Sequence, residues 1–166
     1  MRRRAVIVRR PTEFDELMDR YSTRGQVEFV LRSRGRTLES VERAHESHVA
    51  ALARVCAGIP DGWASADVER DSLSRFLFAP EDVIVVVGPD GLVANVAKYV
   101  DTQVVVGINS VPESQAGVLV RCAPEEGICA LRRLDEGADL RVDHLTMVQA
   151  SVDDSRSLRA LNEVFI

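Results

Sequence analysis

Apolar and polar residues follow one another in segments whose spacing predicts a strand and then helices from the start of the chain. The apolar run 5–8 predicts the strand, after which Thr12 caps a predicted helix that continues to about Tyr21. A second helix is predicted over 24–33, because Gly35 follows its last periodic residue and glycine commonly ends a helix there. The chain is therefore expected to open with a strand and two helices.

A third, longer helix is predicted after Thr37, which would cap it. Its apolar positions recur at spacings of three and four and form one stripe with two histidines: Leu38, Val41, His45, His48, Leu52 and Val55. The histidines allow a metal-binding interpretation, but an i,i+3 pair without a nearby third ligand is a weak metal signal. The stripe favours packing of both rings against a sheet, with one polar edge in water.

Further strands and helices are predicted along the rest of the chain, separated by breaks that contain glycine or proline. In chain order they are a strand over 63–68, a short helix over 72–78, a helix over 124–134, a strand over 140–150 and a segment of strand composition over 161–166. Residues 110–117 predict a loop, and residues 153–155 predict a turn.

Residues 83–87 are all valine or isoleucine and predict a buried strand, which leads through 88–91 into a helix to about Tyr99. A second β-branched run, 104–109, follows after the length of chain that a parallel β-α-β unit needs, so two neighbouring parallel strands are expected. Parallel strands end at one edge of a sheet, where such folds bind ligands, so 88–91 predicts a phosphate-binding loop. The predicted fold class is α/β, with a Rossmann-like, mostly parallel sheet flanked by helices.

The length and composition fit one packed domain. The 166 residues are 46% hydrophobic and 28% charged, so a single soluble packed unit over 1–166 is expected. The net charge of −5 is uneven, because ten arginines and five acidic residues give 1–36 a charge of +5 and leave −10 for the rest. Solvated arginines are the favoured interpretation of this basic end over phosphate or nucleic-acid contacts, and no nucleic-acid partner is expected: Arg2, Arg3, Arg4, Arg9 and Arg10.

The cysteines and the hydropathy indicate the compartment. Cys56, Cys122 and Cys129 are odd in number and lack a Cys-x-x-Cys spacing, so neither a disulfide framework nor a structural zinc site is expected. No apolar stretch approaches the ~20 residues that span a bilayer. A cytoplasmic protein with reduced thiols and no membrane contact is predicted.

Three short motifs occur in a defined order along the second half of the chain. Gly88-Pro89-Asp90-Gly91 follows one predicted strand, Gly107-Ile108-Asn109 follows the next, and Asn162-Glu163 lies near the end. Together they resemble the N-terminal domain of the NAD kinases, which has a GGDG-type loop, a GxN after the following strand and an Asn-Glu or Asn-Asp pair. The resemblance covers about residues 82–166. It implies a single α/β nucleotide-binding domain over 1–166, of the NAD kinase N-terminal type.

The resemblance implies an ATP-dependent phosphotransferase that acts on NAD. Asp90 would accept the proton of the 2′-hydroxyl of the adenosine ribose, and ATP would transfer its phosphoryl group to that hydroxyl to give NADP. Mg²⁺ would bridge the ATP oxygens. The family pattern assigns the phosphate loop to Gly88, Pro89 and Gly91, and the binding of NAD to Asn109, Asn162 and Glu163. Related kinases with a similar loop act on lipids, but the Asn-Glu pair and the GxN favour NAD.

The chain departs from the family pattern in three ways. Pro89 stands where a second glycine is usual and lacks an N–H for phosphate, and Leu92 replaces a threonine and so removes a hydroxyl. The C-terminal, largely β domain of the family would begin where this chain ends and is expected to be absent. The face left uncovered would then favour a homo-oligomer or a partner chain.

Other interpretations of the same residues remain open. The chain could be a truncated nucleotide-binding or regulatory module without turnover, or a fragment of a longer kinase. Taken singly, Asp90 could only cap a helix, Asn109 could only make a turn, and Asn162 with Glu163 could only begin a strand.

Overall fold

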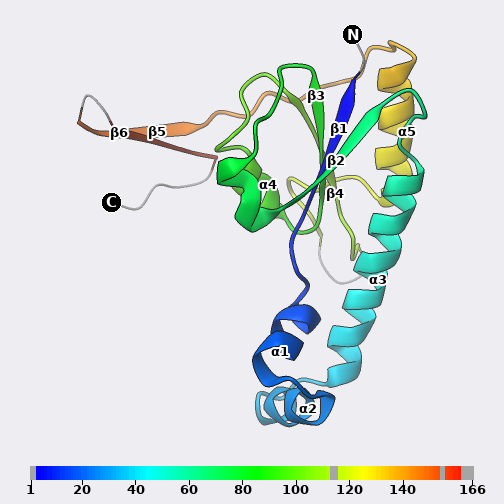
Figure 1. The fold of residues 1–166 in the computed structure, drawn as a ribbon, viewed down its shortest axis with the longest axis vertical. Coiled ribbons are helices and arrows are strands. Elements are labelled where there is room, and N and C mark those ends of the chain that lie inside the picture. Colours follow the sequence, from blue (N-terminus) through cyan, green and yellow to red (C-terminus); the bar gives the residue numbers. More distant parts are fainter. Residues whose placement is uncertain (1–2, 113–115, 154–155, 162–166) are drawn as a thin grey trace.

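A computed structural model describes residues 3–112, 116–153 and 156–161. Its centre is a parallel four-stranded sheet with the strand order β2-β1-β3-β4 (Figure 1). The strands are β1 (Arg4–Arg9), β2 (Ala64–Glu69), β3 (Asp82–Val87) and β4 (Val104–Ile108). The predicted α/β class is confirmed, and so are the neighbouring parallel strands β3 and β4. Because all four strands run the same way, their carboxyl ends lie at one edge.

Helices cover both faces of this sheet. On one face lie α3 (Leu38–Ala57) and α5 (Pro124–Asp135), and on the other lie α4 (Asp90–Val96) and the 3-10 helix η1 (Arg70–Arg75). Alternate residues of β1 belong to the two resulting clusters, with Ala5 and Ile7 in one and Val6 and Val8 in the other. The apolar runs of the sequence are therefore strands buried on both sides.

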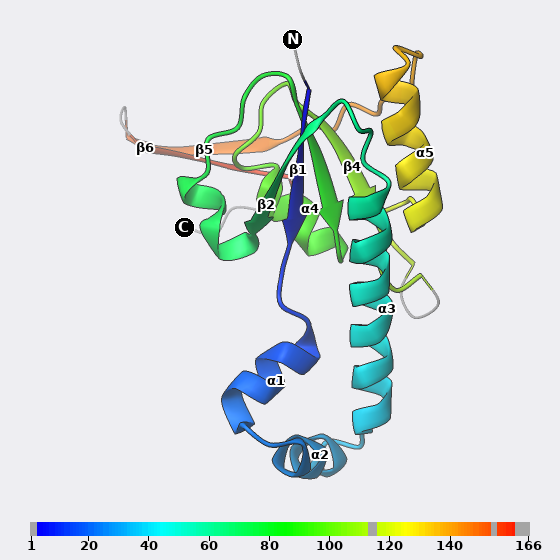
Figure 2. The same cartoon turned by 45° about the vertical axis from the view of Figure 1, so that its right-hand side comes forward.

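Two helices and part of a third lie beyond the carboxyl edge of the sheet (Figure 2). They are α1 (Glu13–Tyr21), α2 (Arg24–Ser33) and the first half of α3, and we call residues 13–45 the helical lobe. The lobe has its own small core, made of Phe14, Leu17, Met18, Tyr21, Val27, Leu31, Leu38 and Val41. Both α1 and α3 begin at the predicted threonine caps, whose side-chain oxygens accept backbone N–H groups.

Two predicted helices differ from the structure. The helix expected over 72–78 is instead the 3-10 helix η1, and the side chain of Glu69, which precedes it, makes no capping hydrogen bond. The helix ends at Arg75, because Phe76 is already extended. The helix expected to reach Tyr99 ends at Val96, and the next residues form turns. None of the described helices is both long enough and apolar enough to cross a membrane.

The last part of the chain also differs from the prediction. Residues 140–147, expected to begin a strand over 140–150, have no regular structure and are mostly exposed, because no strand in the described part of the chain pairs with them. The strand begins later, as β5 (Val148–Asp153), and forms an antiparallel hairpin with β6 (Arg156–Ala160) that extends away from the sheet (Figure 1). Residues 154–155 of the predicted turn and 162–166 of the predicted last strand segment lie outside the described residues.

Candidate functional site

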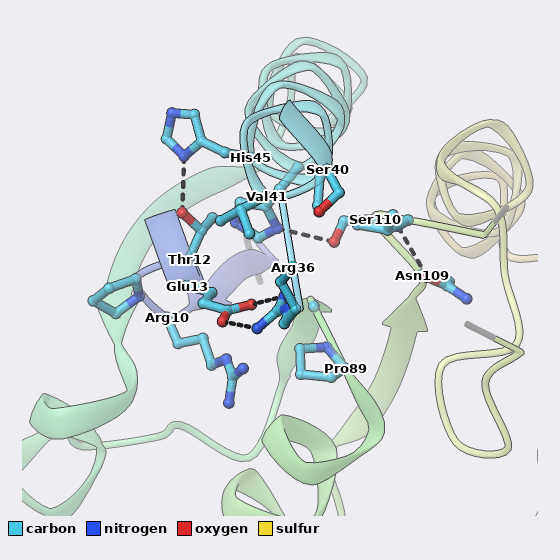
Figure 3. A pocket seen from close by; sticks show the side chains of 15 residues that line it. Arg10, Thr12, Glu13, Arg36, Ser40, Val41, His45, Pro89, Asn109 and Ser110 are labelled. Atoms are coloured by element: carbon cyan, nitrogen blue, oxygen red, sulfur yellow. Dashed lines mark hydrogen bonds and ion pairs between the residues drawn. The ribbon is translucent and has the colours of Figure 1, made fainter. Parts of the chain in front are cut away.

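The strand order reverses between β1 and β3. The chain leaves β1 toward β2 on one side and leaves β3 toward β4 on the other, and open α/β sheets bind ligands where the order reverses in this way. A cavity of ≈ 370 Å³ lies there, and we call it the large cavity (Figure 3). Residues 10–12, 88–89 and 109–111, which follow three strands, line it together with the helical lobe and His48.

Gly88 directs the chain from β3 into α4. Its φ of +153° lies in a region that residues with a side chain rarely adopt, and its N–H donates to the carbonyl of Ile108 at 3.0 Å. Pro89 follows as the residue before the helix, and Asp90 is the first residue of α4. No Cβ contact requires a glycine at Gly91, where the space within 4 Å is open. The glycine at position 88 therefore has a backbone role, and the one at 91 has none in this structure.

Both carboxylate oxygens of Asp90 are engaged by backbone N–H groups. Val118 donates to Oδ2, and Leu119 and Val120 donate to Oδ1, each at 2.8 Å. Asp90 is thus not a cap of its own helix but the anchor of residues 116–122, which we call the strap. A carboxylate offers about four lone-pair positions, so one is left for a further donor.

These bonds determine the charge state of Asp90. Its partial burial alone would raise the pKa, but the N–H groups of Val118, Val120 and Leu119 outweigh that effect together and hold the pKa below its usual value. Asp90 is therefore a stable anion near neutral pH. A lowered pKa also makes it a weaker proton acceptor, since general bases work best when their pKa lies near the operating pH.

The strap lies against β4, and this explains the glycine of Gly107-Ile108-Asn109. A Cβ on Gly107 would lie 2.6 Å from the carbonyl oxygen of Leu119, so only glycine allows the strap to approach. Cys122 extends the contact, because its N–H donates to the Gly107 carbonyl at 3.2 Å and its carbonyl accepts from Asn109 at 2.8 Å. The strap is therefore held at two places, by Asp90 at residues 118–120 and by β4 at Cys122.

A smaller cavity of ≈ 170 Å³, which we call the small cavity, lies between the strap and the start of α4. Asp90, Gly91 and Gly117 are among the residues that line it, whereas Pro89 and Asn109 line both cavities. The predicted phosphate loop and the predicted Asn109 thus meet at one place on the sheet edge. They form the boundary between the two cavities.

Asn109 makes a turn, as one interpretation of its sequence expected. Its Oδ1 accepts the N–H of Val111 at 3.0 Å, the side-chain-to-backbone bond of an Asx turn. The side chain also lies at the edge of the large cavity (Figure 3). A structural role and a position at the cavity edge are therefore combined in this residue.

The two histidines of the α3 stripe reach different partners across the large cavity. His45 Nδ1 lies 2.8 Å from Oγ1 of Thr12, and His48 Nδ1 lies 2.9 Å from Oγ of the buried Ser110 (Figure 3). Burial lowers the pKa of His48, although the charge of Asp15 opposes this, so the ring is neutral at pH 7. The pair ties α3 to the ends of β1 and β4. Among the described residues, no group of three or more His, Cys, Asp or Glu could hold a metal ion.

Three charged side chains line the large cavity. Arg36 reaches across the helical lobe and binds both carboxylate oxygens of Glu13, one of them at 2.8 Å. The Arg36 hydrogen bonds are the main cause of the lowered pKa of Glu13, to which the charges of Arg10 and Arg34 add. Arg10 itself is half-buried and makes no hydrogen bond or ion pair with the described residues. Among the described residues it is thus a cation of the cavity wall that is held in no ion pair.

The structure brings together part of the predicted site. Gly88, Pro89, Asp90, Gly91 and Asn109 lie at one edge, whereas Asn162 and Glu163 lie outside the described residues. Sequence reasoning did not find the cavity wall made by Thr12, Arg36 and Ser110. Their one signal is position, because Thr12 and Ser110 come shortly after predicted strands, while Arg36 reaches the cavity only through the packing of the lobe.

No protein-family model matches the chain, and no curated protein matches it.

Proposed function

We propose that the chain binds nucleotides at the carboxyl edge of its sheet as a domain of the NAD kinase N-terminal type, and transfers phosphate from ATP to NAD. The observation that carries this is the meeting of Gly88-Pro89-Asp90 with Asn109 at the boundary of the two cavities. These residues belong to separate motifs in the sequence, in the order that NAD kinases have. Their convergence where open α/β sheets bind ligands supports a shared site.

In this proposal Asp90 is the group that meets the reacting hydroxyl. Its one remaining lone-pair position would accept the hydrogen of the 2′-hydroxyl of the adenosine ribose. The hydroxyl oxygen then forms the new bond to the γ-phosphorus of ATP, the bond to the leaving ADP breaks, and the proton passes to Asp90. The products are NADP and ADP.

Magnesium would supply charge neutralisation on the transferred phosphates. Among the described residues no cluster of acidic ligands could hold the ion alone. Mg²⁺ would therefore be bound mainly by the ATP oxygens. The residues of the chain would bind and orient the two nucleotides, and Asp90 would accept the proton.

A binding module without turnover is the second candidate, and the state of Asp90 favours it. Three backbone N–H groups engage its carboxylate, and its lowered pKa weakens it as a base. A domain of this kind would keep its affinity for nucleotides and form no NADP.

NADP formation from NAD, ATP and Mg²⁺ by the purified chain distinguishes the two candidates. Asp90→Asn is expected to lower NADP formation by about a hundredfold or more, the usual contribution of a general base. Asp61→Asn, an equal charge change at an exposed turn residue, is the matched control and should change little. Nucleotide binding by calorimetry without NADP formation would establish the binding module, and failure to bind either nucleotide would exclude both candidates.

A further inference from the structure

The arginines around β1 differ in how their charges are matched. Arg4 binds the buried carboxylate of Asp82 through two nitrogens, at 2.8 and 2.6 Å. Arg9 binds two carboxylates of β2, at 3.0 and 2.8 Å. Both arginines therefore stabilise the strand pairs that they connect. Arg10, the next residue, makes no such bond with any part of the chain that the structure describes, although it is half-buried.

Arg10 lies where a ligand would meet it. It is the first residue after β1, the strand beside the reversal of the strand order, and it lines the large cavity together with Gly88 and Pro89. In Figure 3 Arg10, the Glu13–Arg36 pair and Pro89 surround the same opening. The carboxylate of Glu13 is bonded to Arg36 and interacts with Arg10 only through its charge, so no ion pair with this wall holds the guanidinium of Arg10.

We infer that Arg10 binds the diphosphate group of a nucleotide held in the large cavity. The guanidinium is always charged and presents a planar fork of donors that matches two phosphate oxygens. The other polar groups nearby are committed: Ser40 donates to the Thr37 carbonyl, and Ser110 is bonded to His48. The cavity volume of ≈ 370 Å³ is within the range of small-molecule sites.

This inference rests on the proposed function only for the identity of the nucleotide. ATP and NAD both carry a diphosphate, so the shared chemistry is that group, and the source is decided by experiment. Phosphate binding by Arg10 requires neither turnover nor the carboxylate of Asp90.

The test is calorimetric titration of the full chain with inorganic pyrophosphate, NAD, ATP and adenosine. Arg34→Gln is the matched control for Arg10→Gln, because Arg34 also acts on Glu13 through its charge but does not line the cavity. Loss of a charge-assisted hydrogen bond predicts that Arg10→Gln weakens pyrophosphate binding about tenfold to a hundredfold, and Arg34→Gln less than about threefold. Arg10→Lys should restore part of the affinity, and adenosine binding should not change.

The titrations with NAD and ATP identify which nucleotide supplies the diphosphate. The nucleotide that Arg10→Gln binds more weakly, as it does pyrophosphate, is the one whose diphosphate contacts Arg10. Equal losses of pyrophosphate affinity in Arg10→Gln and Arg34→Gln would overturn the inference, because they would reflect only the positive charge of residues 1–36 and no direct contact. Absence of pyrophosphate binding to the unmodified chain would overturn it too. An unchanged affinity in Arg10→Gln, with NADP still formed and lost in Asp90→Asn, would reject Arg10 alone and leave the proposed function standing.

Discussion

The two cavities at the sheet edge differ in what their charged residues already bind. In the small cavity Asp90 accepts three hydrogen bonds from the backbone of the strap, so its charge is stabilised within the chain. In the large cavity Arg10 makes no hydrogen bond or ion pair with the described residues, although it is also half-buried. The contrast shows that Asp90, which belongs to a recognisable motif, can have a structural role, whereas Arg10, which belongs to none, remains available to bind a ligand.

The contrast also separates stability from binding. A group that is satisfied within the chain contributes to the free energy of folding, and its removal leaves donors without an acceptor. A half-buried charge without a partner contributes little to folding and much to binding an ion of opposite sign. The following substitutions test each side of this difference.

The largest effect is expected at the strap. Gly107→Ala would place a Cβ 2.6 Å from the Leu119 carbonyl oxygen, so the strap must shift, and the free energy of unfolding should fall by about 1–3 kcal/mol. Gly91→Ala is the control, because nothing lies within 4 Å of its Cβ and alanine favours a helix. Denaturant unfolding of both variants measures this, and equal stability of the two would contradict the close approach of the strap.

Asp90→Asn is expected to lower stability by on the order of 1 kcal/mol near pH 7, because three N–H groups lose an anionic acceptor. The lowered pKa of Asp90 gives the sign of its pH dependence. Its contribution is fully present above the unfolded pKa of about 3.9 and is lost as the pH falls through the lower folded value. The variant should therefore lose less stability than the unmodified chain as the pH falls below about 4. Denaturation midpoints between pH 6 and 2 measure this, and identical acid limbs would contradict it.

A smaller effect is expected at the wall of the large cavity, from His48. Burial lowers its pKa, so the unfolded chain binds this proton more readily, and stability falls as the pH drops below the unfolded value of about 6.5. His48→Gln removes the titration, so its stability should fall less between pH 7 and 5, by at most about 1 kcal/mol. His144→Gln, at an exposed position, is the control and should follow the unmodified chain. A pH profile of His48→Gln that matches the control would show that the ring is not held neutral.

The smallest effect is expected at Arg10. Because it makes no hydrogen bond or ion pair with the described residues, Arg10→Gln should change the free energy of unfolding by less than about 0.5 kcal/mol. The measurement is the denaturant midpoint beside that of Arg34→Gln. A loss above 1 kcal/mol would mean that the chain itself uses this charge, and the contrast with Asp90 would disappear.

Local signals in the sequence predicted the elements that local chemistry determines. Thr12 and Thr37 begin helices by accepting backbone N–H groups within the next three residues, and Gly35 ends one, so these bounds are accurate. The valines of β3 and β4 identified two neighbouring parallel strands. Residues 140–147 show the limit, because alternation makes a strand only where another strand pairs with it.

The sequence assigned residues 88–91 and Asn109 to one candidate site, and the structure places them at one edge of the sheet, but the sequence did not indicate what they contact. Gly88, Asp90 and Asn109 were located from their motifs, yet the partners of Asp90 are backbone groups 28 to 30 residues away, which no side-chain pattern records. The reason for Gly107 is likewise a carbonyl of the strap. The availability of Arg10 follows from what Arg4 and Arg9 bind, and that depends on the fold as a whole.

The most direct test of a nucleotide site at this edge is a titration of the ¹⁵N-labelled chain with NAD, followed by amide chemical shifts. The account predicts shifts concentrated at Arg10, Thr12, Gly88 and Ser110, which line the large cavity. Smaller shifts are expected at residues 118–120, whose N–H groups already bind Asp90. Shifts confined to the β5–β6 hairpin, or none at millimolar NAD, would contradict it.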